Sequence, residues 1–301
     1  MAAGYHDLVE AFVLGARVAY LAYRASAEAA RRLPASVSRP LARSAGVIAS
    51  VATPARRAQV KRNLARITDD QLSDDEMRRA VAQVFENYSR YWLELFRSGE
   101  GNFGSMELKG RNHLDELSGG AILALPHLGN WDLGGGFLCS QGFPLTVVAE
   151  TIEPPELFEF FTASRERLGM EVVPLDTQAT GKLIKALDAD RLVCLVADRD
   201  ISGDGVEVEF FGERTKVPGG PALLALRTGA PLLPAAAFFG SHDSHVIEIR
   251  KPLKVAREGS LRQDVVRITQ ELVRNFEDFI RTAPDQWLVL QPNWPSDRLA
   301  Q

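Results

Sequence analysis

The sequence predicts a single α/β domain, in which helices cover a mixed, mostly parallel sheet, preceded by N-terminal amphipathic helices. From about residue 105, short runs rich in β-branched and apolar residues alternate with helical segments, which is typical of a sheet covered by helices. Before that point the chain is rich in Ala and Arg at helical spacing. We therefore expect a helical region at 1–104 and an α/β core at 105–301, joined as one structural unit.

The elements of the core follow from their apolar patterns. The expected strands are apolar runs at 121–126, 145–150, 171–175, 191–197, 232–239 and 244–250. Helical patterns fall at 132–140, 155–168, 179–190 and 218–228, and a closing amphipathic helix is expected at 261–282. Ahead of the core, Ser73 and Glu76 form a capping-box pattern, which predicts a helix that ends near Gly99. Trp287 and Trp294 follow the last helix, and their expected role is core or interface packing, with a membrane-interface contact as the alternative.

Two Ala-rich and Arg-rich stretches, 8–34 and 39–67, have the periodicity of amphipathic helices. In one interpretation, the segment Leu8 to Tyr23 packs on its own domain. In the other, it lies in a membrane interface, where Arg17, Arg24, Arg31 and Arg32 meet the headgroups of an anionic membrane surface. Arg17 and Arg24 interrupt the best apolar stretch, and no stretch approaches the ~20 uncharged residues of a spanning helix. A soluble or peripheral protein is expected.

The composition excludes several classes of protein. Hydrophobic residues make up 46% and charged residues 25%, as in ordinary globular proteins, so disordered and fibrous classes are excluded. A net charge of -4 without a dominant basic stripe argues against a nucleic-acid partner. His242 and His245 have no Cys or carboxylate at ligand spacing, so no metal site is expected.

The segment LPHLGNWDLGGG at 125–136 is the first candidate for chemistry. A buried-type strand ends at Pro126 and brings His127 to the carboxyl edge of the sheet, where active sites of open α/β sheets lie. Asp132 follows five residues later, near the start of a helix. His127 can take a proton from an attacking hydroxyl, and a carboxylate on its other ring nitrogen would fix the tautomer. We predict Asp132 as that partner; the alternative is a structural loop histidine.

A second group of charges follows another hydrophobic strand, in the segment 192–235. Asp198, Arg199 and Asp200 come directly after this strand, and Glu207, Glu209, Arg214 and Lys216 follow in a region rich in Gly and Asp. Each charge alone has a simple alternative as a solvated surface residue. Their concentration at strand ends favours a binding site at the same edge as His127.

These motifs together resemble the bacterial lipid A biosynthesis and phosphatidylinositol mannoside acyltransferases, a branch of the lysophospholipid acyltransferase superfamily. The hallmark of that superfamily is a His, four residues, and then Asp or Glu. The resemblance covers roughly residues 55–295 and is carried by VKRNLAR (60–66), HLGNWDLGG (127–135), SRERLGMEVVPL (164–175), LVADRD with EVEFFGE (195–213) and VPGGPALLALRTGAPLLPA (217–235). The form HxGNWD is closer to the mannoside acyltransferases than to most lipid A enzymes, which often carry Glu at the last position.

The resemblance implies a role for each matching residue. His127 matches the general base and Asp132 its carboxylate partner. Arg165 falls where the family places a basic residue near the donor phosphate or acceptor headgroup. Asp198, Arg199, Asp200 and Glu209 fall in the block that shapes the acceptor site. There the glycerolipid acyltransferases carry a Pro-Glu-Gly-Thr-Arg type sequence, so the departure favours a sugar acceptor, whose hydroxyls donate to clustered carboxylates.

The implied reaction is transfer of a fatty acyl group from acyl-CoA or an acyl carrier protein to a sugar hydroxyl of a membrane glycolipid, most like phosphatidylinositol mannoside acylation. No metal or redox cofactor is implied, and the expected location is peripheral, at the cytoplasmic face of the bacterial cell membrane. Backbone amides after His127, or Arg165, are candidates to stabilise the oxyanion. The alternatives are a lipid A type or lysophospholipid acyltransferase, a thioesterase in which His127 activates water, and a non-catalytic lipid-binding protein.

Overall fold

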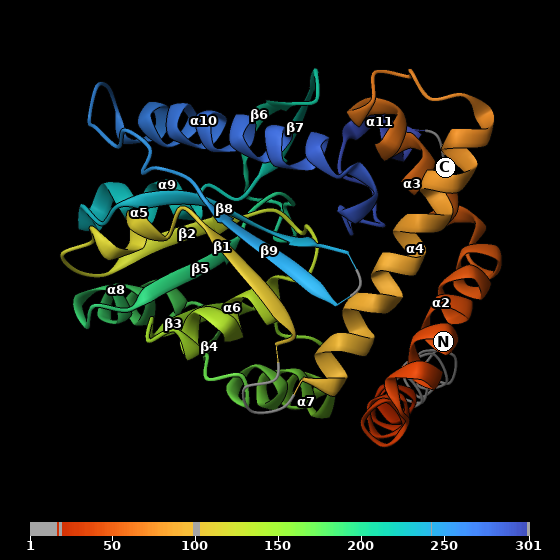
Figure 1. The fold of residues 1–301 in the computed structure, drawn as a ribbon. Coiled ribbons are helices and arrows are strands. Elements are labelled where there is room, and N and C mark those ends of the chain that lie inside the picture. The colour runs from red at the N-terminus through yellow and green to blue at the C-terminus, as the bar shows by residue number, and fades with distance from the viewer. Residues whose placement is uncertain (1–16, 18–19, 99–102, 242, 300–301) are drawn as a thin grey trace, which may run out of the picture.

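The computed structural model describes residues 17, 20–98, 103–241 and 243–299, and its centre is a seven-stranded sheet flanked by helices (Figure 1). The strands of this sheet have the order β1-β9-β8-β2-β5-β3-β4. Their bounds are Ser105–Lys109 (β1), Ala121–Leu125 (β2), Leu145–Ala149 (β3), Glu171–Pro174 (β4), Leu192–Val196 (β5), Leu232–Phe239 (β8) and Ser244–Ile249 (β9).

The pairing of the strands confirms a mixed, mostly parallel sheet. Strands β8, β2, β5, β3 and β4 run parallel to one another, whereas β9 is antiparallel to β8 and parallel to β1. All six strands expected from the sequence are present. The sequence prediction missed β1, whose five residues SMELK include only two large apolar side chains.

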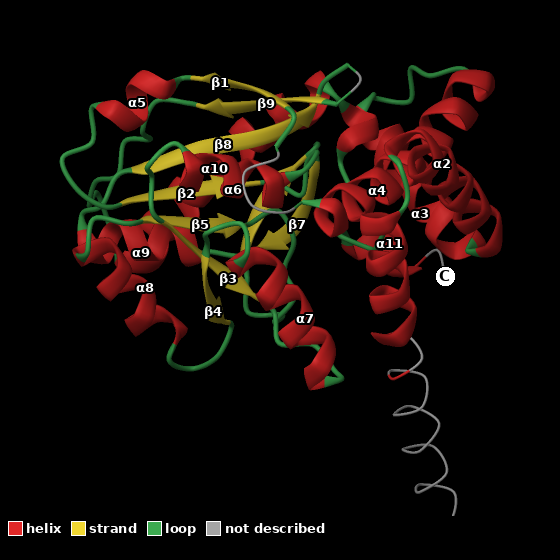
Figure 2. Cartoon of the chain, turned by 60° about the horizontal axis from the view of Figure 1, so that its bottom comes forward, coloured by secondary structure: helices red, strands yellow, loops and turns green. Residues whose placement is uncertain are grey.

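Helices cover both faces of the sheet (Figure 2). Their bounds are Arg111–Asp115 (α5), Trp131–Ser140 (α6), Pro155–Glu166 (α7), Ala179–Asp188 (α8), Gly220–Thr228 (α9), Leu261–Thr282 (α10) and Pro295–Leu299 (α11), with a short 3-10 helix at Pro284–Gln286 (η1). Strand β2 alternates between two cores: Ile122 and Ala124 pack with α8, α9 and α10, whereas Leu123 and Leu125 pack with α5 and α6. The central strand is therefore apolar on both faces, as a buried parallel strand requires.

A second sheet is a two-stranded hairpin of β6 (Val206–Phe210) and β7 (Glu213–Val217), which the sequence prediction also missed. Val208 and Phe210 face the core, while Glu207 and Glu209 face outward, so the hairpin has the period-2 pattern of a half-buried sheet. The turn at Phe211 and Gly212 places both residues at positive φ. The alternation of apolar and acidic residues in VEVEF and the glycine at position 212 were the sequence signals from which the hairpin could have been predicted.

The N-terminal helices lie beside the carboxyl edge of the parallel strands (Figure 1). Their bounds are Ala35–Ala52 (α2), Pro54–Ile67 (α3) and Asp74–Arg97 (α4), and residues 20–32 are also helical. The capping box of Ser73 and Glu76 is confirmed. The helix expected at 39–67 is divided instead, because Pro54 begins a new helix. Most of the segment Leu8 to Tyr23 lies outside the described residues, and in the described part of the chain no helix is long and apolar enough to cross a membrane.

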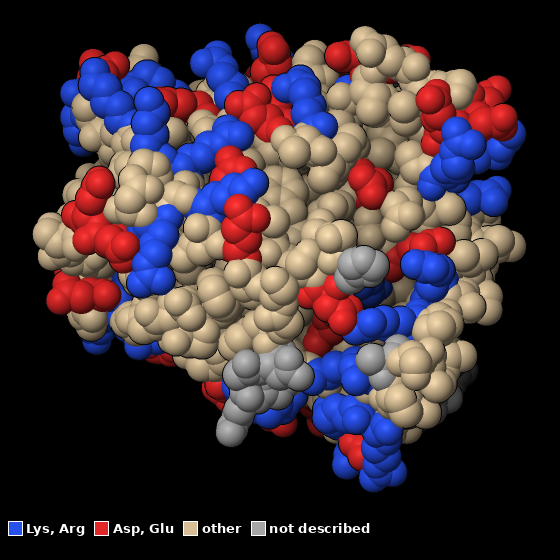
Figure 3. All heavy atoms as spheres, viewed as in Figure 1, with Lys and Arg blue, Asp and Glu red and all other residues tan. Residues whose placement is uncertain are grey.

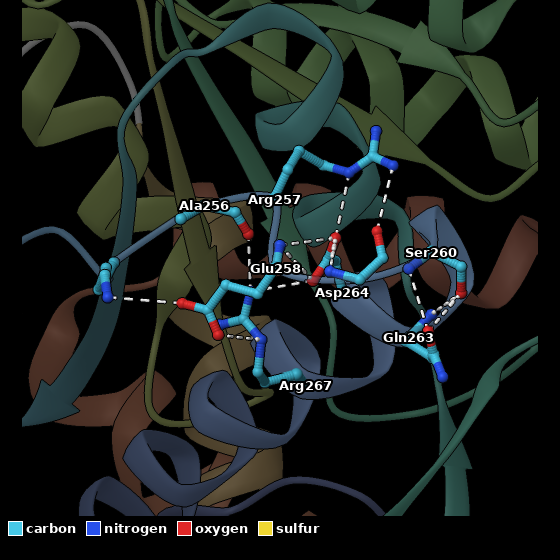
Figure 4. A network of polar contacts seen from close by, with 9 residues as sticks. Ala256, Arg257, Glu258, Ser260, Gln263, Asp264 and Arg267 are labelled. Carbon is cyan, nitrogen blue, oxygen red and sulfur yellow. Dashed lines mark hydrogen bonds and ion pairs between the residues drawn. The ribbon is translucent and has the colours of Figure 1, made fainter.

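A polar network fixes the start of α10 (Figure 4). Ser260 and Gln263 form a capping box, and the buried Asp264 accepts hydrogen bonds from the backbone amides of Glu258 and Gly259. Arg257 and Arg267 both pair with the same carboxylate. An acid in the first turn of a helix also interacts favourably with the helix dipole. The long helix that covers one face of the sheet is thus anchored where it begins.

Candidate active site

The register between the neighbouring strands β2 and β5 places His127 beside Asp198. In the parallel pair of β2 and β5, Leu125 lies opposite Val196, and the next hydrogen bond along runs from the amide of Ala197 to the carbonyl of Leu125. His127 and Asp198 each come two residues after these partners. The two side chains therefore lie side by side at the carboxyl edge of the sheet, where the loops of α/β sheets form active sites.

The contact between them is short and has two parts. Nδ1 of His127 lies 2.6 Å from Oδ1 of Asp198, and the backbone amide of His127 donates to Oδ2 at 2.8 Å. The indole Nε1 of Trp287 donates to the same Oδ2 at 2.7 Å. The Asp198 side chain is fully buried, while that of His127 is 25% exposed. We call His127 and Asp198 the dyad.

The electrostatics of the dyad favour a charged Asp198. Burial alone raises the pKa of a carboxyl group, but the His127 ring and the hydrogen bonds from His127 and Trp287 outweigh burial and hold the pKa of Asp198 below its ordinary value. An ionised carboxylate on Nδ1 makes that nitrogen the proton donor. Nε2 of His127 is then the nitrogen that can accept a proton from a substrate.

The prediction that Asp132 is the partner of His127 is wrong in this structure. Asp132 stands in the first turn of α6, where both its oxygens are bound to other residues. Nε and Nη2 of Arg165 lie 2.7 Å and 3.1 Å from Oδ1 and Oδ2, and the hydroxyl of Tyr91 donates to Oδ2 at 2.5 Å. The side chain of Asp132 is buried, so this bidentate pair is shielded from water. We call Asp132, Arg165 and Tyr91 the arginine cluster.

Arg165 was expected near the donor phosphate or the acceptor headgroup, and in the structure its guanidinium binds Asp132. Its side chain is 19% exposed, and two of its nitrogens already bind Asp132. Burial disfavours the guanidinium charge, but the Asp132 carboxylate more than compensates and raises the pKa of Arg165. Burial, followed by the Asp132 charge, raises the pKa of Tyr91 well above its ordinary value, so its hydroxyl stays protonated as a donor.

Asn130 organises the loop between His127 and α6. Its side chain accepts from the amide of Leu133 and caps the helix, and its Nδ2 donates to Glu94 of α4 at 2.9 Å. The same Glu94 carboxylate lies 2.9 Å from Nε2 of the buried His245. The amides of Leu128 and Gly129 are bound to the carbonyls of Pro126 and Gln286, so these two amides are not free to stabilise an oxyanion.

Within the described ranges, the other charged residues of the second group form no hydrogen bond or ion pair with the side chains of the dyad. Asp200 accepts from the amides of Gly203 and Gly205 and so shapes its own loop, while Arg199 is partly exposed beside it. Glu209 lies on the outer face of the β6–β7 hairpin, opposite Arg214. The prediction of Asp198 as an acceptor-binding carboxylate is also corrected, because its buried oxygens are used by His127 and Trp287.

A hollow of about 400 Å³ lies across α4 from the arginine cluster, bordered by Arg39, Arg90, Arg97, Asp243 and His245. Arg39 pairs with Asp243, Arg90 pairs with Glu94, and Arg97 donates to backbone carbonyls before α2. These side chains have partners within the protein, although Nη2 of Arg90 and Nδ1 of His245 are buried without a hydrogen bond to any described residue. We place no substrate there.

Sequence reasoning missed Tyr91, Trp287 and Asn130 as parts of this site. Tyr91 and Trp287 come from elements far from His127 in the chain, and only the fold brings them to the carboxylates. Asn130 carried a signal, because an Asn directly before a helical pattern is a common N-cap. No group of three or more potential metal ligands occurs within the described ranges, and His242 lies outside them.

Comparison with known proteins places the chain among enzymes of lipid acylation. The sequence model of the bacterial lipid A biosynthesis acyltransferases matches residues 14–296. A phosphatidylinositol mannoside acyltransferase of Mycolicibacterium smegmatis is 36% identical over 301 residues, covering 94% of each chain. One of Mycobacterium tuberculosis is 37% identical over 253 residues, covering 79% of this chain and 77% of that protein.

Among solved structures, a 1-acyl-sn-glycerophosphate acyltransferase of Thermotoga maritima is similar with a TM-score of 0.35 and 13% identity, over 74% of this chain and 96% of that one. The sequence matches span the helices, the dyad and the arginine cluster alike. The chain therefore belongs to the bacterial lipid A biosynthesis acyltransferase family.

Proposed function

We propose that the protein transfers a fatty acyl group from a thioester donor, acyl-CoA or an acyl carrier protein, to a sugar hydroxyl of a membrane glycolipid of the phosphatidylinositol mannoside type. The observation that carries the proposal is the dyad: a partly exposed imidazole, oriented by a buried carboxylate, at the carboxyl edge of the sheet. The acyltransferase family supplies the reaction class, and the names of the two mycobacterial relatives support the acceptor class.

In this mechanism, Nε2 of His127 takes the proton of the acceptor hydroxyl as the oxygen attacks the thioester carbonyl. Asp198 stabilises the imidazolium that forms, because its charge lies on the opposite ring nitrogen. The tetrahedral intermediate then collapses: the new C–O ester bond remains, the C–S bond breaks, and the imidazolium returns the proton to the thiolate. His127 starts and ends neutral, and no acyl-enzyme forms.

The arginine cluster has a supporting part in the proposal. Asp132 holds Arg165 by two hydrogen bonds, so the guanidinium has a fixed position near the start of α6. Its third nitrogen, Nη1, is the one not bound to Asp132, and we assign it to a phosphate of the donor or the acceptor headgroup. Asp132 thus acts through Arg165 rather than through His127. Arg199, Asp200 and Glu209 remain candidates for the acceptor headgroup.

The acceptor brings the enzyme to a membrane, and α2 supports this part of the proposal. Small residues of α2 pack on α4: a Cβ added at Gly46 would lie 2.6 Å from the carbonyl oxygen of Phe85. The large apolar residues point outward instead, with Ile48 66% and Val51 68% exposed and Val37 and Leu41 on the same face. This arrangement suits a helix whose outer face enters the membrane interface.

The charge around α2 points to an anionic surface. Residues 29–68 contain no Asp or Glu but nine basic residues, Arg31, Arg32, Arg39, Arg43, Arg56, Arg57, Lys61, Arg62 and Arg66. Six of the nine pair with carboxylates from outside this segment, and Arg56, Arg57 and Lys61 are the three others. Elsewhere, as over α10 and the neighbouring strands in Figure 3, both signs are interspersed. Basic residues near an anionic bilayer each contribute about 1 kcal/mol. We propose peripheral binding at the cytoplasmic face of the cell membrane.

The decisive experiment gives purified protein a radiolabelled acyl group on CoA or on an acyl carrier protein. Each donor is combined separately with a phosphatidylinositol mannoside, a lipid A precursor, a lysophosphatidate or no acceptor. Label should move to the mannoside, and the His127→Ala protein should move none. Release of free fatty acid at the same rate without acceptor would identify a thioesterase instead. Absence of any turnover with either carrier would contradict the enzyme proposal and leave a lipid-binding protein.

Membrane binding is tested by sedimentation with neutral and anionic vesicles. The double variant Ile48→Ser/Val51→Ser should pellet several-fold less with anionic vesicles than the parent. The matched control is Leu175→Ser/Leu261→Ser, which removes two exposed apolar side chains elsewhere. A variant lacking residues 1–34 tests the first amphipathic segment in the same assay. Equal pelleting of all four proteins would contradict both helices as the binding surface.

A further inference from the structure

The chain that follows α10 runs beside His127, and its backbone is hydrogen-bonded to the backbone of residues 127–129. Leu128 and Trp287 form an antiparallel bridge, the amide of Leu288 donates to the carbonyl of His127 at 2.8 Å, and the amide of Gly129 donates to the carbonyl of Gln286 at 2.9 Å. His127, which follows β2, is thus paired with a short extended segment that lies more than 150 positions later in the chain. We call residues 286–288 the strap.

The Trp287 side chain reaches the one group that orients His127. Its indole N–H donates to Oδ2 of Asp198 at 2.7 Å, and the ring is buried against Phe210 and Trp294. Oδ1 of Asp198 binds the His127 ring, so the indole occupies the oxygen that the ring does not use. A tryptophan has a single polar atom, and burying it requires a partner. Here that partner is the carboxylate.

The segment directly after the strap, residues 289–297, is held by α3 and by Asp198. Asn63 of α3 donates to the carbonyl of Val289 at 2.8 Å, and the buried Asp297 pairs with Arg66 at 2.8 Å. Asn293 donates from Nδ2 to the backbone carbonyl of Asp198 at 3.1 Å. The backbone on both sides of Trp287 is therefore held by residues 127–129, and the chain beyond it is held by α3 and Asp198.

We propose that Trp287 is a positioning residue of the acyl transfer reaction. Its N–H holds the Asp198 carboxylate at the distance and angle that keep Nδ1 of His127 as the proton donor. It touches no reacting atom and acts through Asp198. This inference rests on the proposed function, because turnover is one of its readouts.

The test compares Trp287→Phe with Trp294→Phe. Both tryptophans are buried, and both donate an indole hydrogen bond, but Trp294 donates to the carbonyl of Phe210 at 3.0 Å. Loss of a hydrogen bond to a charged group should lower the kcat of Trp287→Phe by about 10-fold to 100-fold, with KM unchanged for both substrates. Trp294→Phe should lower the melting temperature about as much as Trp287→Phe does. Its kcat should stay within about twofold of that of the parent.

A double-mutant cycle separates positioning from a structural role. In the Asp198→Asn background, Trp287→Phe should change kcat by less than about twofold, since the group through which it acts is gone. Additive losses, or equal losses in kcat for the two tryptophan variants, would overturn the proposal. If Trp287→Phe does not fold, Trp287→Leu, which also lacks the indole N–H, takes its place in the same cycle with the same expected coupling.

A readout without turnover distinguishes failure of this inference from failure of the proposed function. The Nδ1 proton of His127, hydrogen-bonded to Asp198, should give a low-field proton resonance that is missing in His127→Ala. That resonance should shift or exchange faster with water in Trp287→Phe and stay in place in Trp294→Phe. An unchanged resonance in Trp287→Phe would overturn the positioning role even if the protein catalyses no acyl transfer.

Discussion

Two buried aspartates at the carboxyl edge of the sheet, Asp198 and Asp132, have contrasting neighbours. Asp198 faces the imidazole of His127 and an indole, whereas Asp132 faces a guanidinium and a phenol. Asp132 is five residues from His127 in the chain and Asp198 is 71 away. Closeness in sequence therefore does not identify the partner of a histidine at a strand end; the register of neighbouring strands does.

The largest effect should come from His127, whose Nε2 is the proton acceptor in the proposed mechanism. His127→Ala should lower kcat by ~100-fold to 10,000-fold, as loss of a general base does. Its melting temperature should also fall, because the buried Asp198 carboxylate loses the hydrogen bond from the ring. The measurement is transfer of labelled acyl groups to the glycolipid. Activity within threefold of the parent would show that another group moves the proton.

The next largest effect should separate the two aspartates. Asp198→Asn should lower kcat on the order of 1,000-fold with little change in KM, since it removes the charge that stabilises the imidazolium. Asp132→Asn should lower kcat by no more than about tenfold and raise KM, because it releases Arg165. Initial rates against both substrates decide between them. A larger loss of kcat in Asp132→Asn would restore Asp132 as the direct partner of His127.

Arg165→Ala should act on stability and binding together. It leaves the buried Asp132 carboxylate with only the Tyr91 hydroxyl, which should cost about 3 kcal/mol of the free energy of unfolding. KM should rise more than kcat falls. Arg167→Ala is the control, since Arg167 ends the same helix, is exposed, and donates to Ser164. Equal urea midpoints for the two variants would argue against the buried pair.

Tyr91→Phe should have a smaller effect. It removes one donor from Asp132 while the two bonds to Arg165 remain, so about 1 kcal/mol of stability should be lost. Tyr88→Phe, one turn earlier on α4, serves as the control in the same urea titration. A kcat loss beyond about tenfold in Tyr91→Phe would mean that the phenol takes part in the reaction.

The smallest effect concerns acid pH. Because the folded protein lowers the pKa of Asp198, its carboxylate contributes stability that is present above the ordinary carboxyl pKa of about 3.9 and is lost as pH falls through the lowered value. Asp198→Asn has no such group, so its unfolding free energy should decline less steeply than that of the parent below about pH 4. Parallel curves would contradict an ionised Asp198.

Much of the fold was predictable, because the strands β2, β5 and β8 are continuous apolar runs and the capping boxes at Ser73 and Ser260 are local signals. His127 was predictable as a site residue from its place after β2. Its partner was not, because pairing Leu125 with Val196 requires knowing which strands are neighbours. Trp287 was interpreted as a core residue, which is confirmed for its ring, but no local pattern reveals where its N–H points.

The dyad also ties chemistry to the completion of folding. Asp198 lies 71 residues after His127 in the chain, and Trp287, which binds the dyad, lies 89 residues after Asp198. Contacts of such long range form late, since the chain must first order the intervening segments. A molecule in which the sheet has formed but the chain after α10 has not packed lacks the indole hydrogen bond to Asp198. We therefore expect partly folded molecules not to react with thioesters. Acyl donors should be consumed only by completely folded molecules.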